Sequence, residues 1–354
     1  MKLAGASAIT RIALNPECGL QVAMLRSGLS EPKFYERVTG EPYPGEYGER
    51  LSARRRGSKF ERNAYANDAA LLRQALGPMI GVPPSDLWVR NLEDEEPGAR
   101  EDCRIRRWRR TIEILGDHVG GRPSAHILIQ PQLRVTAGGL IDKPGFWIAP
   151  DILFIEQASG MYRPADLKSF VVRGHQVEPA DLERSRLQVA IQSVALHEAL
   201  QGVGDRRRLT HTGGFIFATP YGLSPHPPQL ETLDGSVDRV QKALVALRKH
   251  GQYLDALKGP EGAQREDFLL ESIPIHYQER CIGSCALAGV CRKRHQGRAH
   301  ELGDAAVQLL GPDIELDRAF ALMTGAKPKT DAERTLAKAL AALNQPFRDI
   351  DQAA

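Results

Sequence analysis

Residues 146–156 read FWIAPDILFIE, and after a QASG turn residues 161–170 read MYRPADLKSF. Both segments are mostly apolar and contain the branched and aromatic residues that favour strands. The glycine-containing connection between them predicts that the two strands are neighbours. This strand pair is the centre of the expected fold, and the other expected elements are arranged around it.

Charged side chains stand inside these apolar strands. Side chains alternate along a strand, so Asp166 and Lys168 point to one face and Leu167 to the other. A further carboxylate, Asp151, follows Pro150 on the first strand. Carboxylates hold a hard divalent cation, and an ammonium group can sit beside the water that the cation activates. The pattern therefore indicates a metal-dependent phosphodiester hydrolase.

A surface hairpin with an Asp–Lys salt bridge is the alternative interpretation of the same residues. It explains the pattern poorly, because both strands are apolar enough to be buried. Unpaired charges on a buried strand cost roughly several kcal/mol unless partners or a metal satisfy them. The sequence therefore favours the metal site.

Apolar periodicity in the flanking chain predicts an α/β fold. The expected elements are a helix over residues 58–76, strands over 125–135, 147–156 and 162–172, a helix over 182–200 and a strand over 213–219. The second of these helices carries an apolar stripe at helical spacing, namely Leu187, Ala190, Ile191, Val194 and Ala195. Outside this αβββαβ order, we expect helices in residues 10–40, 236–256 and much of 301–354, and irregular structure in residues 41–57 and 81–124.

Pro150-Asp151 followed by Asp166-Leu167-Lys168 resembles the signature of the PD-(D/E)xK nuclease superfamily, in the form of its RecB-like branch. That branch includes CRISPR-associated and AddB-like exonucleases. The resemblance implies the αβββαβ core of the superfamily, with a mixed sheet, flanking helices and a cysteine-ligated cluster region. It covers residues 10–300, so we expect a nuclease domain over residues 1–300 and a helical tail over residues 301–354.

The same resemblance assigns roles to individual residues. Asp151 corresponds to the central metal-binding acid of the family, Asp166 to the acid of its (D/E)xK motif and Lys168 to the lysine. Glu61, in the fragment RRRGSKFERNAY, corresponds to the acid of the first motif on the opening helix. A glutamate in a first helical turn is equally explained by compensation of the helix dipole.

The helix over residues 182–200 resembles the family's fourth motif, a Gln followed four residues later by Tyr. Gln188 matches the Gln, but Gln192 stands where Tyr is usual. Two glutamines four residues apart share one helix face and could reach Lys168 or a DNA backbone. The alternative for Gln192 is a polar stripe that faces solvent.

The residue types define an expected mechanism. Asp151 and Asp166, with Glu61, are expected to bind one or two Mg²⁺ or Mn²⁺ ions. The metal lowers the pKa of a bound water, and the resulting hydroxide attacks phosphorus. Lys168 orients that water and offsets charge on the phosphoryl oxygens.

Three of the five cysteines lie close together, Cys281, Cys285 and Cys291, with the spacing C-x3-C-x5-C. An odd number of cysteines argues against a disulfide framework and for thiols or a metal site. The resemblance implies a structural [4Fe-4S] cluster with Cys18 as a distant fourth ligand, although the family spacing is usually C-x2-C-x5-C. Such a cluster would join the two ends of the domain.

A zinc site is the alternative for these cysteines. Cys281, Cys285, Cys291 and His295 resemble a CCCH zinc finger, which binds single-stranded RNA. Cys18 would then be a buried core thiol. Cys103, within EDCRIRRWRR, is expected to have no ligand role in either case.

Dense basic clusters are the sequence feature that points to nucleic acid. They occupy residues 54–56, 104–110, 206–208 and 292–294. Such clusters bind phosphate backbones largely without sequence information, and solvated surface loops are the alternative. We therefore expect a DNA nuclease of repair or antiviral defence, and a non-catalytic nucleic-acid-binding scaffold is the competing class. The sequence contains no GxxxxGK[ST] loop, so a helicase partner would be a separate chain.

Bulk composition is ordinary and limits the alternatives only weakly. The chain has 354 residues, of which 42% are hydrophobic and 26% charged, and a formal net charge of +3. No apolar run approaches the roughly 20 residues that a membrane helix needs. The N-terminal residues lack a long apolar segment, so a cytoplasmic location without membrane association is expected.

Overall fold

The computed structural model describes most of the chain. The described residues are 6–43, 51–136, 146–169, 179–205, 207, 210–219, 222–249, 271–278, 281, 285–293, 296–302, 304–311 and 314–340. The chain forms two compact units. The first comprises Met1–Pro16, Gln21–Gly28 and Glu49–Leu254, and the second comprises Glu17–Leu20, Leu29–Gly48 and Asp255–Ala354. The expected boundary near residue 300 lies inside the second unit and stays a prediction.

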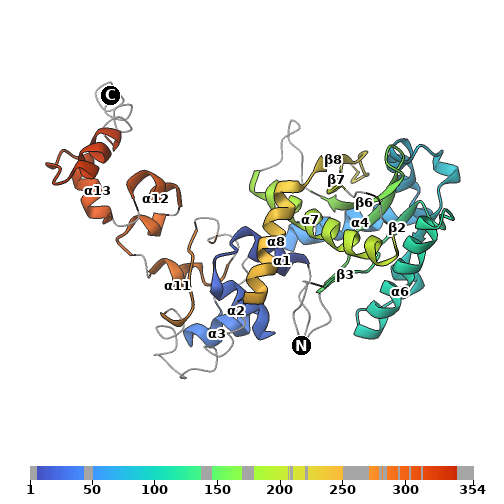
Figure 1. The fold of residues 1–354 in the computed structure, drawn as a ribbon, viewed down its shortest axis with the longest axis horizontal. Helices are drawn as coiled ribbons and strands as arrows, with labels where there is room; N and C mark the ends of the chain where they lie inside the picture. Colours follow the sequence, from blue (N-terminus) through green and yellow to red (C-terminus); the bar gives the residue numbers. More distant parts are fainter. Residues whose placement is uncertain are drawn as a thin grey trace. The chain divides into compact units, whose positions relative to one another are not determined.

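A six-stranded mixed sheet organises the first unit (Figure 1). Its strands, in spatial order, are β1 (Val89–Asn91), β2 (Ile127–Ile129), β5 (Ile152–Glu156), β6 (Met161–Lys168), β7 (Thr212–Phe217) and β8 (Gln229–Thr232). The pairs β1–β2 and β6–β7 are parallel, and the other neighbours are antiparallel. A separate antiparallel pair joins β3 (Leu133–Val135) to β4 (Phe146–Ile148). The expected α/β class with a mixed sheet is confirmed.

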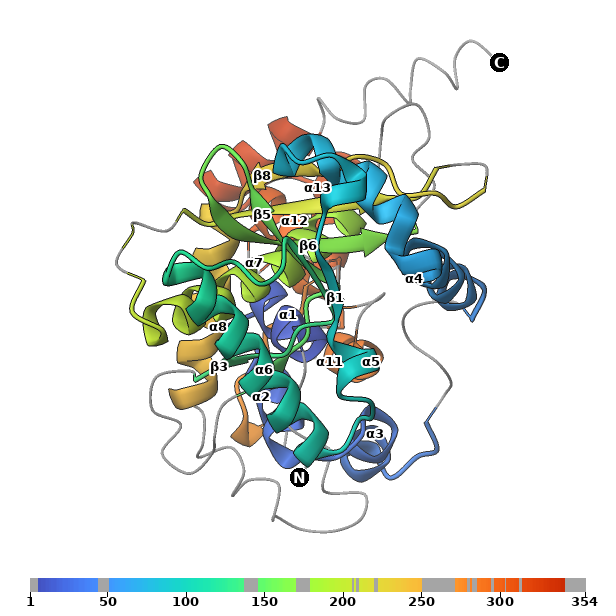
Figure 2. The ribbon, with the colours of Figure 1, turned by 90° about the vertical axis from the view of Figure 1, so that its right-hand side faces the viewer.

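Helices cover both faces of this sheet (Figure 2). The helices of the first unit include α1 (Ala6–Leu14), α4 (Leu51–Ile80), α5 (Leu92–Glu95), α6 (Glu101–Val119), α7 (Pro179–Gly202) and α8 (Asp234–Lys249). The helix α2 (Gly19–Ser27) has residues in both units, and the second unit contains α3 (Glu31–Thr39), α11 (Ala288–Lys293), α12 (Asp304–Leu310) and α13 (Leu316–Met323). Residues 331–340 are also helical. The expected helices in residues 10–40 and 182–200 are confirmed.

Alternation along β5 explains the two hydrophobic layers. Phe154 packs with Phe60 and Leu72 of α4 on one face. Leu153 packs with Leu187 and the rest of the expected apolar stripe of α7 on the other face. Because successive strand residues point to opposite sides, a strand buried on both faces is apolar throughout. The apolar run in residues 152–155 therefore places β5 in the middle of three layers.

The helix α4 differs from the expected helix over residues 58–76. It begins at Leu51, inside the expected loop 41–57, and continues past Pro78 to Ile80, which is buried. It is also interrupted, because the backbone of Ala66 to Ala69 is not helical and three of these residues have φ between 51° and 55°. Figure 2 shows the two helical pieces. The left-handed region is unfavourable for residues other than glycine, so tertiary packing must hold this bend.

Two further expectations are wrong in detail. Residues 81–124 are not irregular, because they contain β1, α5 and the long helix α6. The expected strands 125–135 and 147–156 are each divided into two strands, with Gln130-Pro131 and Ala149-Pro150 at the breaks. A proline has no amide hydrogen and cannot continue a ladder of hydrogen bonds, which explains both divisions. Within the described residues, no helix has the length and apolar character needed to cross a membrane.

Candidate active site

The carboxylate of Asp166 and the ammonium of Lys168 form an ion pair at the end of β6. The distance from Lys168 Nζ to Asp166 Oδ2 is 2.6 Å. Lys168 Nζ also donates a hydrogen bond of 2.7 Å to Oε1 of Gln188, which α7 brings to this face of the sheet. Asp166 is only 6% exposed. The sequence prediction that these three residues belong to one cluster agrees with this geometry.

Asp151 lies beside Asp166 because of the register of β5 and β6. Ile152 pairs with Ala165 in this antiparallel ladder, so the preceding residue on β5 is opposite the following residue on β6. Asp151 Oδ2 accepts a hydrogen bond of 2.8 Å from the amide of Leu167. Burial raises the pKa of Asp151 well above its ordinary value, and the nearby charge of Asp166 raises it further.

The cluster therefore holds more negative than positive charge. Among the described residues, the adjacent carboxyl groups of Asp151 and Asp166 share one ammonium group, that of Lys168. Two like charges in a poorly solvated place are unfavourable unless a proton or a cation offsets one of them. The donors are oxygen atoms, which are the ligands preferred by Mg²⁺ and Mn²⁺. These carboxylates fit a divalent cation that takes its remaining ligands from water and substrate.

Tyr65 is a further member of this cluster that the sequence did not reveal. Its hydroxyl lies 3.5 Å from the carbonyl oxygen of Asp151, and Nε2 of Gln130 lies 3.4 Å from that hydroxyl. Burial raises the pKa of Tyr65, and the charges of Asp151, Glu61 and Asp166 raise it too. The sequence signal was present, because Tyr65 lies four residues after Glu61 and therefore on the same helix face.

Glu61 occupies a different position on its helix from the one expected. Since α4 begins at Leu51, Glu61 is not in the first turn, and compensation of the helix dipole does not explain it. Its charge acts on the hydroxyl of Tyr65, which places Glu61 at the margin of the cluster around Asp151. Its role as a metal ligand stays a prediction.

Gln192 does not belong to a solvent-facing stripe. It is 3% exposed and lies one turn after Gln188 on α7. Within the part of the chain that the structure describes, its buried Oε1 accepts no hydrogen bond. An unpaired buried amide oxygen costs about 1–3 kcal/mol. The alternative interpretation from the sequence is therefore wrong for this residue.

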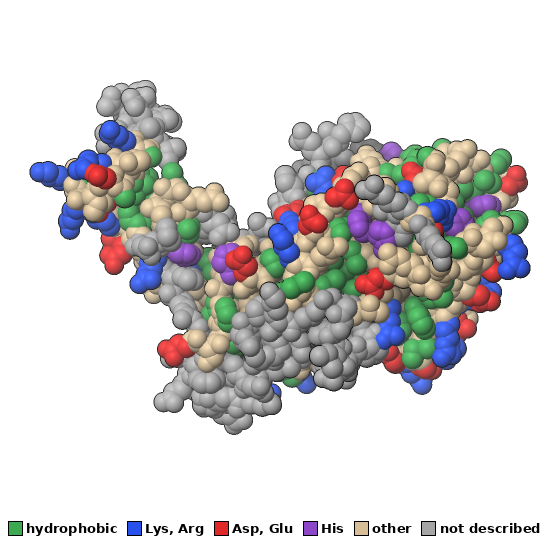
Figure 3. Space-filling model, in the orientation of Figure 1, with side chains coloured by type: hydrophobic (Ala, Val, Ile, Leu, Met, Phe, Trp, Pro, Cys, Tyr) green, Lys and Arg blue, Asp and Glu red, His purple; other side chains and the backbone are tan. Residues whose placement is uncertain are grey.

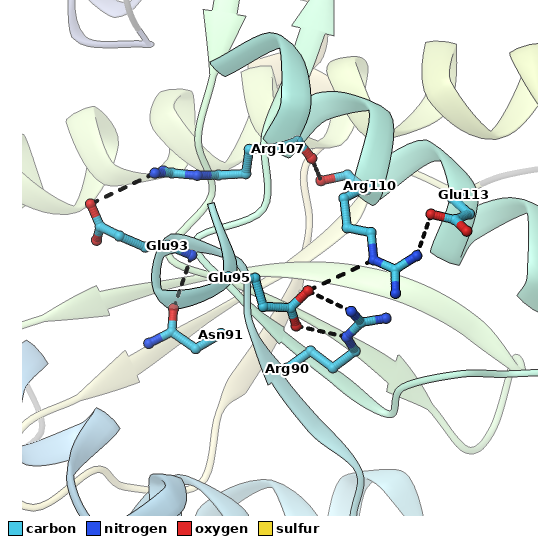
Figure 4. A network of polar contacts seen from close by, with 8 residues as sticks. Arg90, Asn91, Glu93, Glu95, Arg107, Arg110 and Glu113 are labelled. Atoms are coloured by element: carbon cyan, nitrogen blue, oxygen red, sulfur yellow. Dashed lines mark hydrogen bonds and ion pairs between the residues drawn. The ribbon is translucent and has the colours of Figure 1, made fainter. Parts of the chain in front are cut away.

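Three of the five arginines in residues 104–110 have partners in the same unit, and Figure 4 shows two of them, Arg107 and Arg110. Arg107 is 5% exposed and donates hydrogen bonds to the carbonyl oxygens of Glu96 and Gly98. Arg106 pairs with Glu96 and Asp102, and Arg110 with Glu95 and Glu113. Around α6, acidic and basic side chains lie next to each other on the surface (Figure 3). Arg107 is therefore not available to a phosphate backbone, and the binding of nucleic acid by the other arginines of this cluster stays a prediction.

The other basic clusters are described only in part. Arg55 is exposed, and Nε of Arg56 donates a hydrogen bond of 2.8 Å to the carbonyl of Ser169, next to Lys168. Arg207 pairs with buried Asp205. The side chains at positions 54, 206, 208, 293 and 294 lie outside the described residues.

All five cysteines are buried. Cys18, Cys281, Cys285 and Cys291 belong to the second unit. Burial raises the pKa of the Cys285 thiol to about 12, and the neighbouring Cys18 and Cys281 contribute to this rise. These three cysteines are therefore close to one another, although Cys18 is distant in sequence.

The described coordinates do not themselves outline a metal cage. Within the ranges given above, no three His, Cys, Asp or Glu side chains are arranged so that they could hold a metal ion between them. His295, the fourth ligand of the expected zinc alternative, lies outside the described residues. Cys103 is in α6, where Arg106 donates a hydrogen bond to its sulfur at 3.5 Å. The iron–sulfur and zinc alternatives both stay predictions.

Comparison with known proteins adds no family to this picture. No protein-family model matches the chain, and no curated protein is significantly similar to it.

Proposed function

We propose that this chain is a metal-dependent nuclease that hydrolyses phosphodiester bonds of DNA. The observation that carries the proposal is the convergence of Asp151, Asp166 and Lys168, two buried carboxyl groups and one ammonium group. A surplus of buried acid fits a divalent cation, and an adjacent ammonium fits a phosphoryl oxygen or an attacking water. The resemblance to the RecB-like branch of the PD-(D/E)xK superfamily supports the same chemistry.

The order of the strands is a second support. The chain passes through β2, β5 and β6 as antiparallel neighbours, crosses over through α7 and returns in β7 parallel to β6. With β1, α5 and α6 placed between α4 and β2, this follows the order helix, three strands, helix, strand that the resemblance implies for a PD-(D/E)xK core. The pair β3–β4 is inserted between β2 and β5.

Each residue of the candidate active site has its own role in the proposed reaction. Asp151 and Asp166 would hold the Mg²⁺ or Mn²⁺ ion, which when bound lowers the pKa of a coordinated water. Lys168 orients the attacking water and offsets negative charge that grows on the phosphoryl oxygens. Gln188 accepts a hydrogen bond from Lys168 Nζ and so fixes the direction of the ammonium group. Tyr65 and Gln130 hold the carbonyl of Asp151 and thereby the start of β5.

The cysteines of the second unit support a structural [4Fe-4S] cluster as part of the proposal. Cys18, Cys281 and Cys285 are close enough to influence one another, and Cys291 follows on α11. A cluster with these ligands would close the long chain between residues 18 and 281 and stabilise the second unit. Protein purified without oxygen is expected to contain iron and acid-labile sulfide. If the protein contains zinc and no iron, the alternative of a CCCH zinc finger that binds single-stranded RNA is favoured.

A cleavage assay tests the nuclease. Labelled single- and double-stranded DNA is incubated with Mn²⁺ and either the wild type, Asp166→Asn or Lys168→Met. Loss of one charge that stabilises a transition state lowers kcat by about 10²–10³, and both variants are expected to show at least this loss. Asp102→Asn is the control, because Asp102 is an exposed, ion-paired acid on α6.

Two outcomes would reject the proposal. If the wild type, Asp166→Asn and Lys168→Met cleave DNA equally well, Asp166 and Lys168 are not the catalytic residues. If the wild type binds DNA tightly but does not cleave it with any divalent cation, the chain is instead a non-catalytic nucleic-acid-binding scaffold. A helicase partner and a role in repair or antiviral defence are implied by the resemblance alone. Both would lose their basis if the assay showed no cleavage.

A further inference from the structure

The exposed face of the first piece of α4 carries three basic side chains in a row. Arg55, Lys59 and Arg62 are all exposed and have the spacing i, i+4, i+7, so they share one face of the helix. The opposite face carries Phe60 and Ala64, which are both fully buried against the sheet. We refer to these three basic residues as the α4 stripe.

The α4 stripe differs from Arg106 and Arg110 of α6 in its partners. Arg106 and Arg110 of α6 are paired with acidic residues of the same unit. Among the described residues no acid pairs with Arg55, Lys59 or Arg62; only Arg62 makes a contact, a hydrogen bond from Nε to the carbonyl of Ser58. The positive charge of the stripe is therefore available to an anion, whereas most of the charge on α6 is already offset.

Contacts at both ends of this helical piece place the stripe beside the candidate active site. Near its start, Arg56 Nε donates a hydrogen bond of 2.8 Å to the carbonyl of Ser169, the residue after Lys168. At its end, the hydroxyl of Tyr65 lies 3.5 Å from the carbonyl of Asp151. The helical piece thus spans from the end of β6 to the start of β5. Its exposed stripe is held in a fixed relation to both carboxylates.

The length of the stripe suits a short run of phosphates. Seven residues of α-helix rise about 10 Å. Each strand of duplex DNA carries a charge about every 3.4 Å along the helix axis, so the stripe can face about three phosphates of one strand. Contacts of this kind fix the register of the strand and carry no sequence information.

We infer that Arg55, Lys59 and Arg62 bind the phosphate backbone of the DNA strand that enters the site of Asp151, Asp166 and Lys168. This inference rests on the proposed nuclease function and names the surface that delivers the substrate. It does not depend on Arg106 and Arg110 of α6, whose charges are paired with acidic residues. Substrate selection along α4 depends on phosphate charge and is independent of base sequence.

Salt dependence of binding tests the stripe without any chemistry. All variants carry Asp166→Asn, so that no cleavage occurs, and binding of a labelled single-stranded oligonucleotide is followed by anisotropy at several salt concentrations. Each phosphate contact with single strands contributes about 0.7 to the slope of log K against log salt. Replacing Arg55, Lys59 and Arg62 by Ala is expected to reduce that slope by about 2. The matched control, Arg106→Ala with Arg110→Ala, is expected to keep the parent slope.

The outcomes separate this inference from the proposed function. An unchanged slope in the stripe variant, with a melting temperature equal to that of the parent, overturns the inference. Reduced binding to polyglutamate with unchanged binding to DNA also overturns it and identifies an acidic polypeptide as the occupant. Failure of the nuclease proposal appears elsewhere, as cleavage that survives Asp166→Asn, and in that case the binding slope is measured in EDTA, where metal-dependent cleavage does not occur.

Discussion

Strand β6 carries buried charge at both of its ends, and the two ends differ in charge balance. Near its start, Arg163 is 7% exposed at the side chain and pairs with Glu156 at 2.9 Å, while Nη1 donates to the carbonyl of Thr210. Near its end, Lys168 faces both Asp166 and Asp151. One end holds equal numbers of opposite charges, and the other holds a surplus of acid.

This difference separates a structural ion pair from a place prepared for a ligand. A buried ion pair is satisfied within the fold, and breaking it leaves one charge without compensation. A buried surplus of one sign lowers the stability of the protein until a ligand of the other sign arrives. If that interpretation is right, the same kind of substitution should have opposite effects at the two ends of β6.

The largest effect is expected at the balanced end. Arg163→Met leaves the half-buried carboxylate of Glu156 without its partner and should lower the free energy of unfolding by about 3 kcal/mol. Urea denaturation measures this change. Adding Glu156→Gln should recover part of the loss, because the uncompensated charge is removed. A loss below about 1 kcal/mol would show that the two ends do not differ as described.

Divalent cations should act only at the acidic end. At about 100 times its Kd, Mg²⁺ or Mn²⁺ should raise the free energy of unfolding by about 2.7 kcal/mol. Thermal unfolding with EDTA and with each cation measures this gain. Asp166→Asn should lose most of the gain, whereas Arg163→Met should keep it. An equal response in both variants would place the cation elsewhere.

A moderate pH effect is expected near the balanced end. Burial, together with the charges of the adjacent His211 and Arg163, lowers the pKa of His197 to about 4. Because the folded pKa is below the unfolded value near 6.5, this histidine contributes stability above about pH 6.5 that is lost as pH falls toward 4. After allowance for solvent screening, the loss should be about 1–2 kcal/mol. Denaturation of His197→Gln between pH 7 and pH 4.5 should show a flatter profile than the wild type.

The smallest effect is expected from relieving the acidic surplus. In EDTA at neutral pH, Asp166→Asn should raise the free energy of unfolding by about 1 kcal/mol, because one of two repelling carboxylates is removed. The control Asp102→Asn removes an exposed acid that pairs with Arg106 and should change stability by less than about 0.5 kcal/mol. If Asp166→Asn is instead destabilised, the ion pair between Asp166 and Lys168 contributes more to stability than the repulsion between Asp166 and Asp151 costs.

The contact between β6 and α7 was predictable because it depends on short-range periodicity. Alternation along a strand places Asp166 and Lys168 on one face, and the apolar stripe of α7 orients Gln188 toward the same face. The register of β5 and β6 then brings Asp151 alongside. Each step needs only a pattern a few residues long.

The helix α6 was missed because polar residues occupy its buried side. Arg107 and Thr111 are buried together with Cys103, Ile114 and Leu115. Nη2 of Arg107 and the hydroxyl of Thr111 donate hydrogen bonds to neighbouring carbonyl groups, so burial there does not follow the apolar periodicity used to recognise a helix. The bend in α4 was missed for a similar reason, since long-range packing overrides the strong local helix preference of this segment.

The bend in α4 is also a suitable place for a fluorescent label. Ala66, Asn67 and Asp68 are exposed at a point where the helix is already interrupted, immediately after the tyrosine that touches Asp151. A fluorophore attached at position 67 would therefore disturb neither a helical hydrogen bond nor the core. Its emission would report in real time when a substrate strand arrives and departs.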